Sequence, residues 1–169
     1  WMFCIVYFAY CFFLQSILVH IVPHATDLQI SPSNSANILA IIGMVAIISR
    51  LVIGSTGDRF GNKRAISIAL ILAIIALSWL QLARELWMFY LFAVIFGFAY
   101  GGIGVIMSPI VAELFGLRAH GAILGAANFA CATGAAVGPL MTGHIFDTTG
   151  SYFLAFWVCA GLSAISLIL

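Results

Sequence analysis

The chain alternates between long, unbroken runs of apolar residues and short polar segments. A helix needs about 20 apolar residues to cross a hydrocarbon core of roughly 30 Å. By this measure the sequence predicts six membrane-spanning helices, at residues 1–22, 36–54, 65–83, 86–111, 122–145 and 152–169. The segments between them carry turn-forming or charged residues and are predicted to be loops, at 23–35, 55–64, 84–85, 112–121 and 146–151.

The composition agrees with a protein whose surface faces lipid. Hydrophobic residues make up 64% of the chain and charged residues only 7%, whereas a soluble domain has about a quarter charged residues. We therefore expect an all-α membrane protein with the lipid bilayer as its surroundings. There is no basic cluster for nucleic acid, and no pattern indicates a metal or another cofactor.

The four cysteines all lie inside apolar runs, and no pair of them has metal-ligand or redox spacing. We interpret them as small buried hydrophobic residues and not as a disulfide framework. They are Cys4, Cys11, Cys131 and Cys159.

The basic residues predict how the chain is oriented in the membrane. The second loop contains Arg59, Lys63 and Arg64, and the fourth contains Arg118, while the opposite side has only Arg84. Because basic loops stay in the cytoplasm, we expect the N-terminal end of the first helix to be cytoplasmic. The predicted location is the cell (cytoplasmic or inner) membrane.

Glycines recur at four-residue spacing in the fourth and fifth predicted helices, as at Gly97 and Gly101 and at Gly134 and Gly138. Such spacing lines one face of a helix with small residues and lets backbones approach closely. Static helix packing and sliding of smooth helix faces during transport are both compatible with it.

Residues 54–64, GSTGDRFGNKR, join the second and third predicted helices by a short charged turn. This stretch resembles the signature G-x-x-x-D-(R/K)-x-G-x-(R/K)-(R/K) of the major facilitator superfamily. In that family the aspartate belongs to an intracellular latch that stabilises the outward-open state, and the same role is implied here. A loop that only sets topology is the alternative. The matching residues, called the latch motif below, are Gly54, Asp58, Arg59, Gly61, Lys63 and Arg64.

The resemblance implies that the six helices are half of a twelve-helix fold built from 3+3 inverted repeats. Residues 19–28, 112–118, 138–140 and 146–152 also resemble the C-terminal half of the branch of monocarboxylate transporters and oxalate:formate antiporters. The chain begins at Trp1 and stops within an apolar run at Leu169. We therefore expect residues 1–169 to be one half-domain whose partner, an N-terminal six-helix half, is absent.

Arg50 is the charged residue placed within a predicted span, eight residues or about 12 Å before Asp58. A buried arginine in hydrocarbon is costly, so it should face a water-filled cavity or a partner. In the monocarboxylate branch an arginine at the matching place binds the substrate carboxylate, which implies the same for Arg50. Some of these carriers have an aspartate one turn earlier, where this chain has Ala46. The alternative is an arginine that snorkels to the surface or pairs with Asp58 or Glu113.

Weaker candidates for substrate binding are uncharged polar residues within the spans. Tyr7 and Gln15 share a helix face, and Tyr100 and Asn128 lie in the middle of the fourth and fifth helices. A packing hydrogen bond is the alternative for each. The resemblance implies that the first, second, fourth and fifth helices line a central cavity and that the third and sixth face lipid.

These features together predict a secondary transporter of small organic anions, foremost monocarboxylates, that works by alternating access. The alternative keeps the fold and changes the cargo to a sugar, a drug or another metabolite, with Arg50 structural. No intramembrane cluster of catalytic residues indicates an enzyme. No carboxylate lies within a span, so a proton-coupled mechanism would require a group from the absent half.

Overall fold

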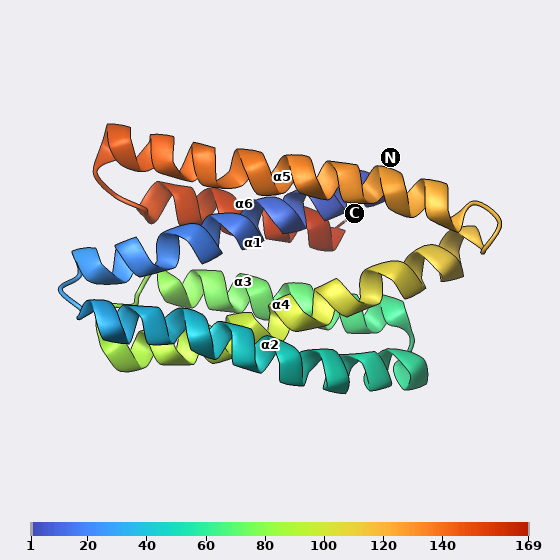
Figure 1. Cartoon of the computed structure of the whole chain (residues 1–169), viewed down its shortest axis with the longest axis horizontal. Helices are drawn as coiled ribbons and strands as arrows, with labels where there is room; N and C mark the ends of the chain where they lie inside the picture. Colours follow the sequence, from blue (N-terminus) through green and yellow to red (C-terminus); the bar gives the residue numbers. More distant parts are fainter. Residues whose placement is uncertain (1, 169) are drawn as a thin grey trace.

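A computed structural model describes the backbone of residues 2–168 and the side chains of residues 2–54 and 61–168. The described chain consists of six α-helices joined by short turns (Figure 1). They are α1 (Met2–Asp27), α2 (Pro32–Phe60), α3 (Asn62–Leu80), α4 (Leu86–Phe115), α5 (His120–Thr149) and α6 (Phe153–Ile168).

Successive helices run in opposite directions along the long axis of the molecule (Figure 1). The turns after α1, α3 and α5 lie at one end, and the turns after α2 and α4 lie at the other end, together with both chain termini. Five helices among the described residues are long and apolar enough to cross a membrane, while the apolar α6 has 16 residues. This all-helical architecture confirms the predicted fold class.

Most helices extend further than the apolar runs, so four of the five predicted loops are mostly helical. In the predicted loop 23–35, α1 continues to Asp27 and α2 already begins at Pro32. The Thr26 hydroxyl donates to the carbonyls of Val22 and Pro23 and supports the last turn of α1. A proline is well suited to the first helical position because no carbonyl there needs its missing N–H. Polar residues thus extend the helices into a segment that was predicted to be a loop because the apolar runs end there.

The predicted loop 55–64 is likewise almost absent, because Gly61 is the residue that separates α2 from α3. Gly61 has a φ of 89°, which residues with a side chain rarely adopt. Glycine therefore permits the sharp turn between the two helices.

Two helix pairs form the framework of the bundle, α1 with α5 and α2 with α4. A side chain at Gly97 or Gly101 would collide with the α2 backbone at Ile42 or Ala46. In the other pair, Gly134 and Gly138 lie in the same way against the α1 backbone at Phe8 and Phe12. Close packing of the two pairs therefore requires glycine at these four positions.

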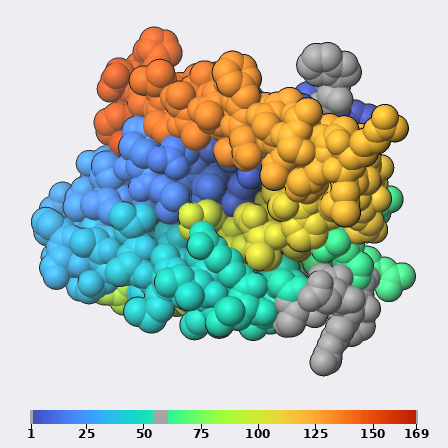
Figure 2. Space-filling model, turned by 45° about the vertical axis from the view of Figure 1, so that its right-hand side comes forward, coloured from blue at the N-terminus to red at the C-terminus, as the bar shows by residue number. Residues whose placement is uncertain are grey.

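The remaining helices, α3 and α6, pack behind these pairs, α3 mainly against α4 and α6 against α3 and α1. The core between the layers is rich in phenylalanine, with fully buried rings at Phe13, Phe89, Phe92, Phe96 and Phe156. On the opposite face α5, α1, α4 and α2 lie exposed side by side (Figure 2). This exposed four-helix surface is called the open face below.

Candidate substrate site

Arg50 lies in α2, ten residues before the helix ends at Phe60, or about 15 Å along the helix axis. Its side chain is exposed, and its guanidinium carbon lies over the ring of Tyr100 in α4, 5.7 Å from the ring centroid. This distance is within the range of a cation–π interaction. A positive charge therefore lies well away from the helix end, where α2 meets α4.

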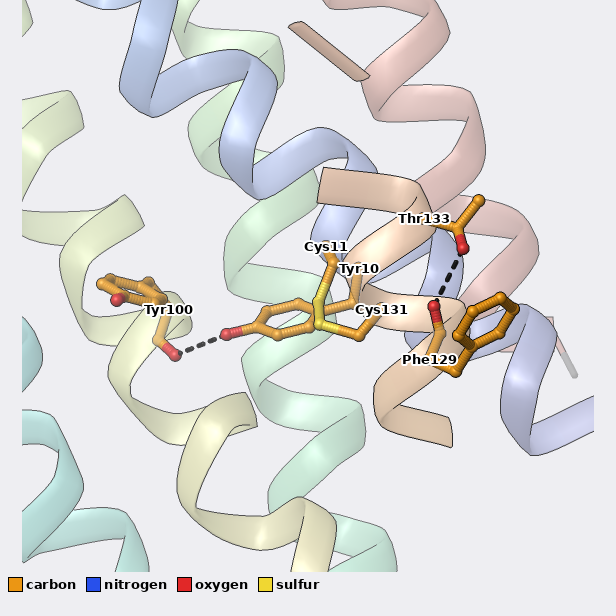
Figure 3. The surroundings of a disulfide bond; sticks show 6 residues. All are labelled: Tyr10, Cys11, Tyr100, Phe129, Cys131 and Thr133. Atoms are coloured by element: carbon orange, nitrogen blue, oxygen red, sulfur yellow. Dashed lines mark hydrogen bonds between the residues drawn. A yellow bond between two sulfur atoms is a disulfide. The ribbon is translucent and has the colours of Figure 1, made fainter. Parts of the chain in front are cut away.

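A chain of tyrosines leads from this arginine to α1. The buried Tyr10 donates a hydrogen bond from its hydroxyl to the backbone carbonyl of Tyr100, at 3.1 Å (Figure 3). The ring of Tyr7 stacks on that of Tyr10 with centroids 6.0 Å apart. The structure thus brings together Arg50, Tyr100 and Tyr7, three of the residues considered for substrate binding.

Tyr10 is a member of this group that the sequence analysis missed. Its position within an apolar run gives it the pattern of a core residue, and it is in fact 3% exposed. The available signal was its place three residues after Tyr7, which puts the two rings on neighbouring positions of one helix face.

Two other predicted residues do not join this group. Gln15 is half-buried further along α1, and Asn128 is exposed on α5. Neither takes part in the ring contacts and the hydrogen bond that link Arg50, Tyr100, Tyr10 and Tyr7. Their role in substrate binding therefore stays a prediction.

The described carboxylates all lie far from the middle of the helices. Asp27 is the last residue of α1, Glu85 precedes α4, and Glu113 and Asp147 are in the last turns of α4 and α5. Ala46, one turn before Arg50, is 2% exposed and lies where α2 crosses Gly101. Among the described side chains, the partner of Arg50 is thus an aromatic ring and not an acid.

Cys11 and Cys131 form a disulfide bond that joins α1 to α5 beside Tyr10 (Figure 3). The interpretation of all four cysteines as unpaired was therefore wrong, while Cys4 and Cys159 are free. The close approach of α5 to α1 at Gly134 brings the two Cα atoms to 5.1 Å, the separation a disulfide needs. The partners are 120 residues apart in the chain, so sequence spacing could not reveal them.

The latch motif surrounds the turn between α2 and α3. The side chains of Asp58 and Arg59 lie outside the described residues, and those of Lys63 and Arg64 are exposed at the start of α3. A side chain at Gly54 would meet Val105 of α4 at an ordinary contact distance of 3.9 Å. The Asn62 side-chain amide donates to Glu113 at 2.9 Å, which connects the turn to the end of α4.

A mainly apolar cavity of about 450 Å³ lies at this same end of the bundle, away from Arg50. Lys63 and Ser67 contribute polar groups to a lining that comes otherwise from apolar residues of α1, α3, α4 and α6, and from Ser166. The cavity is separate from the tyrosine group and contains none of the residues predicted to bind substrate.

Comparison with known proteins connects this arrangement to a family. The model of the Major Facilitator Superfamily matches residues 2–169. Monocarboxylate transporter 12 of Mus musculus is 30% identical over 147 residues, which cover 85% of this chain and 30% of that protein. Monocarboxylate transporter 4 of Gallus gallus is 25% identical over 149 residues, covering 85% and 31%.

A bacterial relative, the uncharacterized transporter YebQ of Escherichia coli, is 26% identical over 145 residues, covering 86% of this chain and 32% of that protein. The chain thus spans about a third of the length of the curated relatives it matches. The family match extends over all six helices, including the glycine-packed pairs and the turn at Gly61. The chain belongs to the major facilitator superfamily.

Proposed function

We propose that this chain is the C-terminal half of a secondary transporter that moves small monocarboxylates by alternating access, with Arg50 binding the substrate carboxylate. Membership of the superfamily identifies a transporter and not an enzyme. The substrate class rests on Arg50 and on the names of the monocarboxylate transporters that the chain is similar to.

The position of Arg50 is the observation that carries the proposal. A guanidinium within a membrane-spanning helix is stable only with a partner or with water. Its planar array of N–H donors matches a carboxylate through two parallel hydrogen bonds. Since its partner among the described side chains is the Tyr100 ring, its positive charge is left for an anion.

The open face supplies half of a central site in this proposal. Its helices α2 and α5 carry exposed apolar side chains, such as Met44, Ile47 and Leu51 on α2 and Phe129 and Leu140 on α5. A second six-helix half would cover the open face and enclose Arg50 between the two halves. Rocking of the halves about the enclosed site would then expose it to each side of the membrane in turn.

The latch motif and the chain orientation belong to the same proposal. The termini and the basic residues Lys63, Arg64 and Arg118 share one end of the bundle, which we assign to the cytoplasm of a cell-membrane protein. Asp58 would stabilise the outward-open state at this end. The Asn62–Glu113 hydrogen bond supports this role because it holds the motif against α4.

The proposal is tested by uptake of labelled lactate, pyruvate, formate and oxalate into vesicles containing the full-length protein. We expect saturable uptake of a monocarboxylate that Arg50→Gln abolishes while the protein remains in the membrane. The matched control is Arg84→Gln, which removes an exposed charge from the turn between α3 and α4.

Unchanged uptake in the Arg50→Gln variant would refute the role of the arginine. Absence of any carboxylate uptake by a folded protein would leave the family standing and favour a sugar, a drug or another metabolite as cargo. A group for proton coupling would have to come from the second half, because the carboxylates described here lie at helix ends and in turns.

A further inference from the structure

We infer that Tyr100 is a positioning residue for Arg50: its ring holds the guanidinium at the site without neutralising the charge that the substrate anion needs. This inference rests on the proposed function and deepens it. It assigns to an aromatic ring the task of fixing the arginine that binds the carboxylate.

The contact has the geometry that this role requires. The guanidinium carbon of Arg50 lies over the ring face, 5.7 Å from its centroid. The negative face of an aromatic ring attracts a cation at this distance, and the attraction is strongest where water is excluded. Tyr100 is half-buried and packs against the apolar core, so part of its surroundings is apolar.

The backbone on both sides of the contact is held in place. The Tyr100 carbonyl accepts a hydrogen bond from Tyr10, and the next residue, Gly101, lies directly against the backbone of Ala46. Ala46 is one helical turn before Arg50, so the tightest contact between α2 and α4 is adjacent to the arginine–ring pair. Helix packing therefore sets the separation of the two backbones from which the arginine and the ring extend.

An aromatic ring beside Arg50 leaves the N–H donors of the guanidinium available for the substrate, whereas a carboxylate would not. An acid beside Arg50 would form an ion pair and compete with the substrate for the same N–H donors. The position one turn earlier is Ala46, which is buried, and the described acids lie at helix ends and in turns. Interaction with the ring restricts the long arginine side chain, which lowers the entropic cost of binding an anion, and keeps its net charge.

The test uses a series of rings at position 100 in the full-length protein, with uptake of labelled pyruvate as the readout. Tyr100→Phe keeps a ring and is the reference, and fluorinated phenylalanines with one, two and three fluorines weaken the negative ring face at nearly constant shape. We expect the KM for pyruvate to rise with each fluorine. Tyr100→Leu should raise it by about 3- to 30-fold over the reference. Tyr90→Leu, in the same helix but away from Arg50, should leave KM unchanged.

A second readout does not depend on transport. The ¹⁹F NMR signal of 4-fluorophenylalanine at position 100 should shift when Arg50 is replaced by Gln, and the same label at position 90 should not. An unresponsive signal at position 100 would show that the ring and the guanidinium are not in contact and would overturn the inference.

The two readouts also separate the inference from the function on which it rests. If Arg50→Gln abolishes pyruvate uptake but KM shows no trend with fluorination, the proposed function stands and the positioning role of Tyr100 is refuted. If Arg50→Gln leaves uptake unchanged, the proposed function fails and the role of Tyr100 fails with it, whatever the NMR signal shows. A KM trend together with the NMR shift supports both.

Discussion

Gly101 of α4 lies against the backbone of Ala46 in α2, so close that no side chain fits between the two helices. This contact adjoins Tyr100 on one helix and lies one turn from Arg50 on the other. We predict that Gly101→Ala separates α2 from α4 and destabilises the full-length protein by about 1–3 kcal/mol, the usual cost of overpacking. Thermal melting followed by size-exclusion chromatography measures the change.

The control for this substitution is Gly161→Ala in α6, where an added methyl group would meet no atom within 4 Å. It should leave the melting temperature unchanged or raise it slightly, because alanine favours helix over glycine. Equal melting temperatures for the two variants would contradict the close packing of α2 on α4.

Replacing Arg50 by lysine keeps the positive charge and removes the planar array of donors. If the substrate carboxylate binds through two parallel hydrogen bonds, Arg50→Lys should raise the KM for pyruvate by about 10-fold or more. Uptake kinetics in vesicles measure this value. A lysine variant with the KM of the parent would indicate that only a point charge is needed at this position.

The disulfide between Cys11 and Cys131 predicts that these two residues resist alkylation until a reductant is added. Cys11→Ser should lower the free energy of unfolding by about 2–4 kcal/mol, since it removes a crosslink across a long loop. Thermal melting with and without reductant measures the effect. Cys4→Ser, at a free cysteine, is the control. Rapid alkylation of Cys11 in the unreduced protein would refute the bond.

The hydrogen bond between Asn62 and Glu113 predicts a shared contribution of the two residues to the latch. Because the pair is exposed, we expect a coupling of about 0.5 kcal/mol in a double-mutant cycle of Asn62→Ala and Glu113→Ala. The readout is the fraction of outward-open protein, which is measured from distances between spin labels attached at the two ends of the helical bundle. Strictly additive shifts would show that the pair does not act together.

The sequence by itself determined the fold class and the family. Unbroken apolar runs are long enough to require a membrane, and the glycine and charged residues at 54–64 form a local motif with fixed spacing. Arg50 could be singled out in the same way, because a charge within a membrane-spanning run is costly and therefore indicates a function. These are properties of consecutive residues, so no knowledge of the packing was needed.

The helix ends and the composition of the site were decided by tertiary structure. Capping and turn geometry, as at Thr26 and Gly61, carried the helices beyond the apolar runs. The pairing of Cys11 with Cys131 and the contact of Arg50 with Tyr100 join residues on different helices. Side chains far apart in the chain meet only where helices pack, and the packing depends on which small residues let two backbones approach.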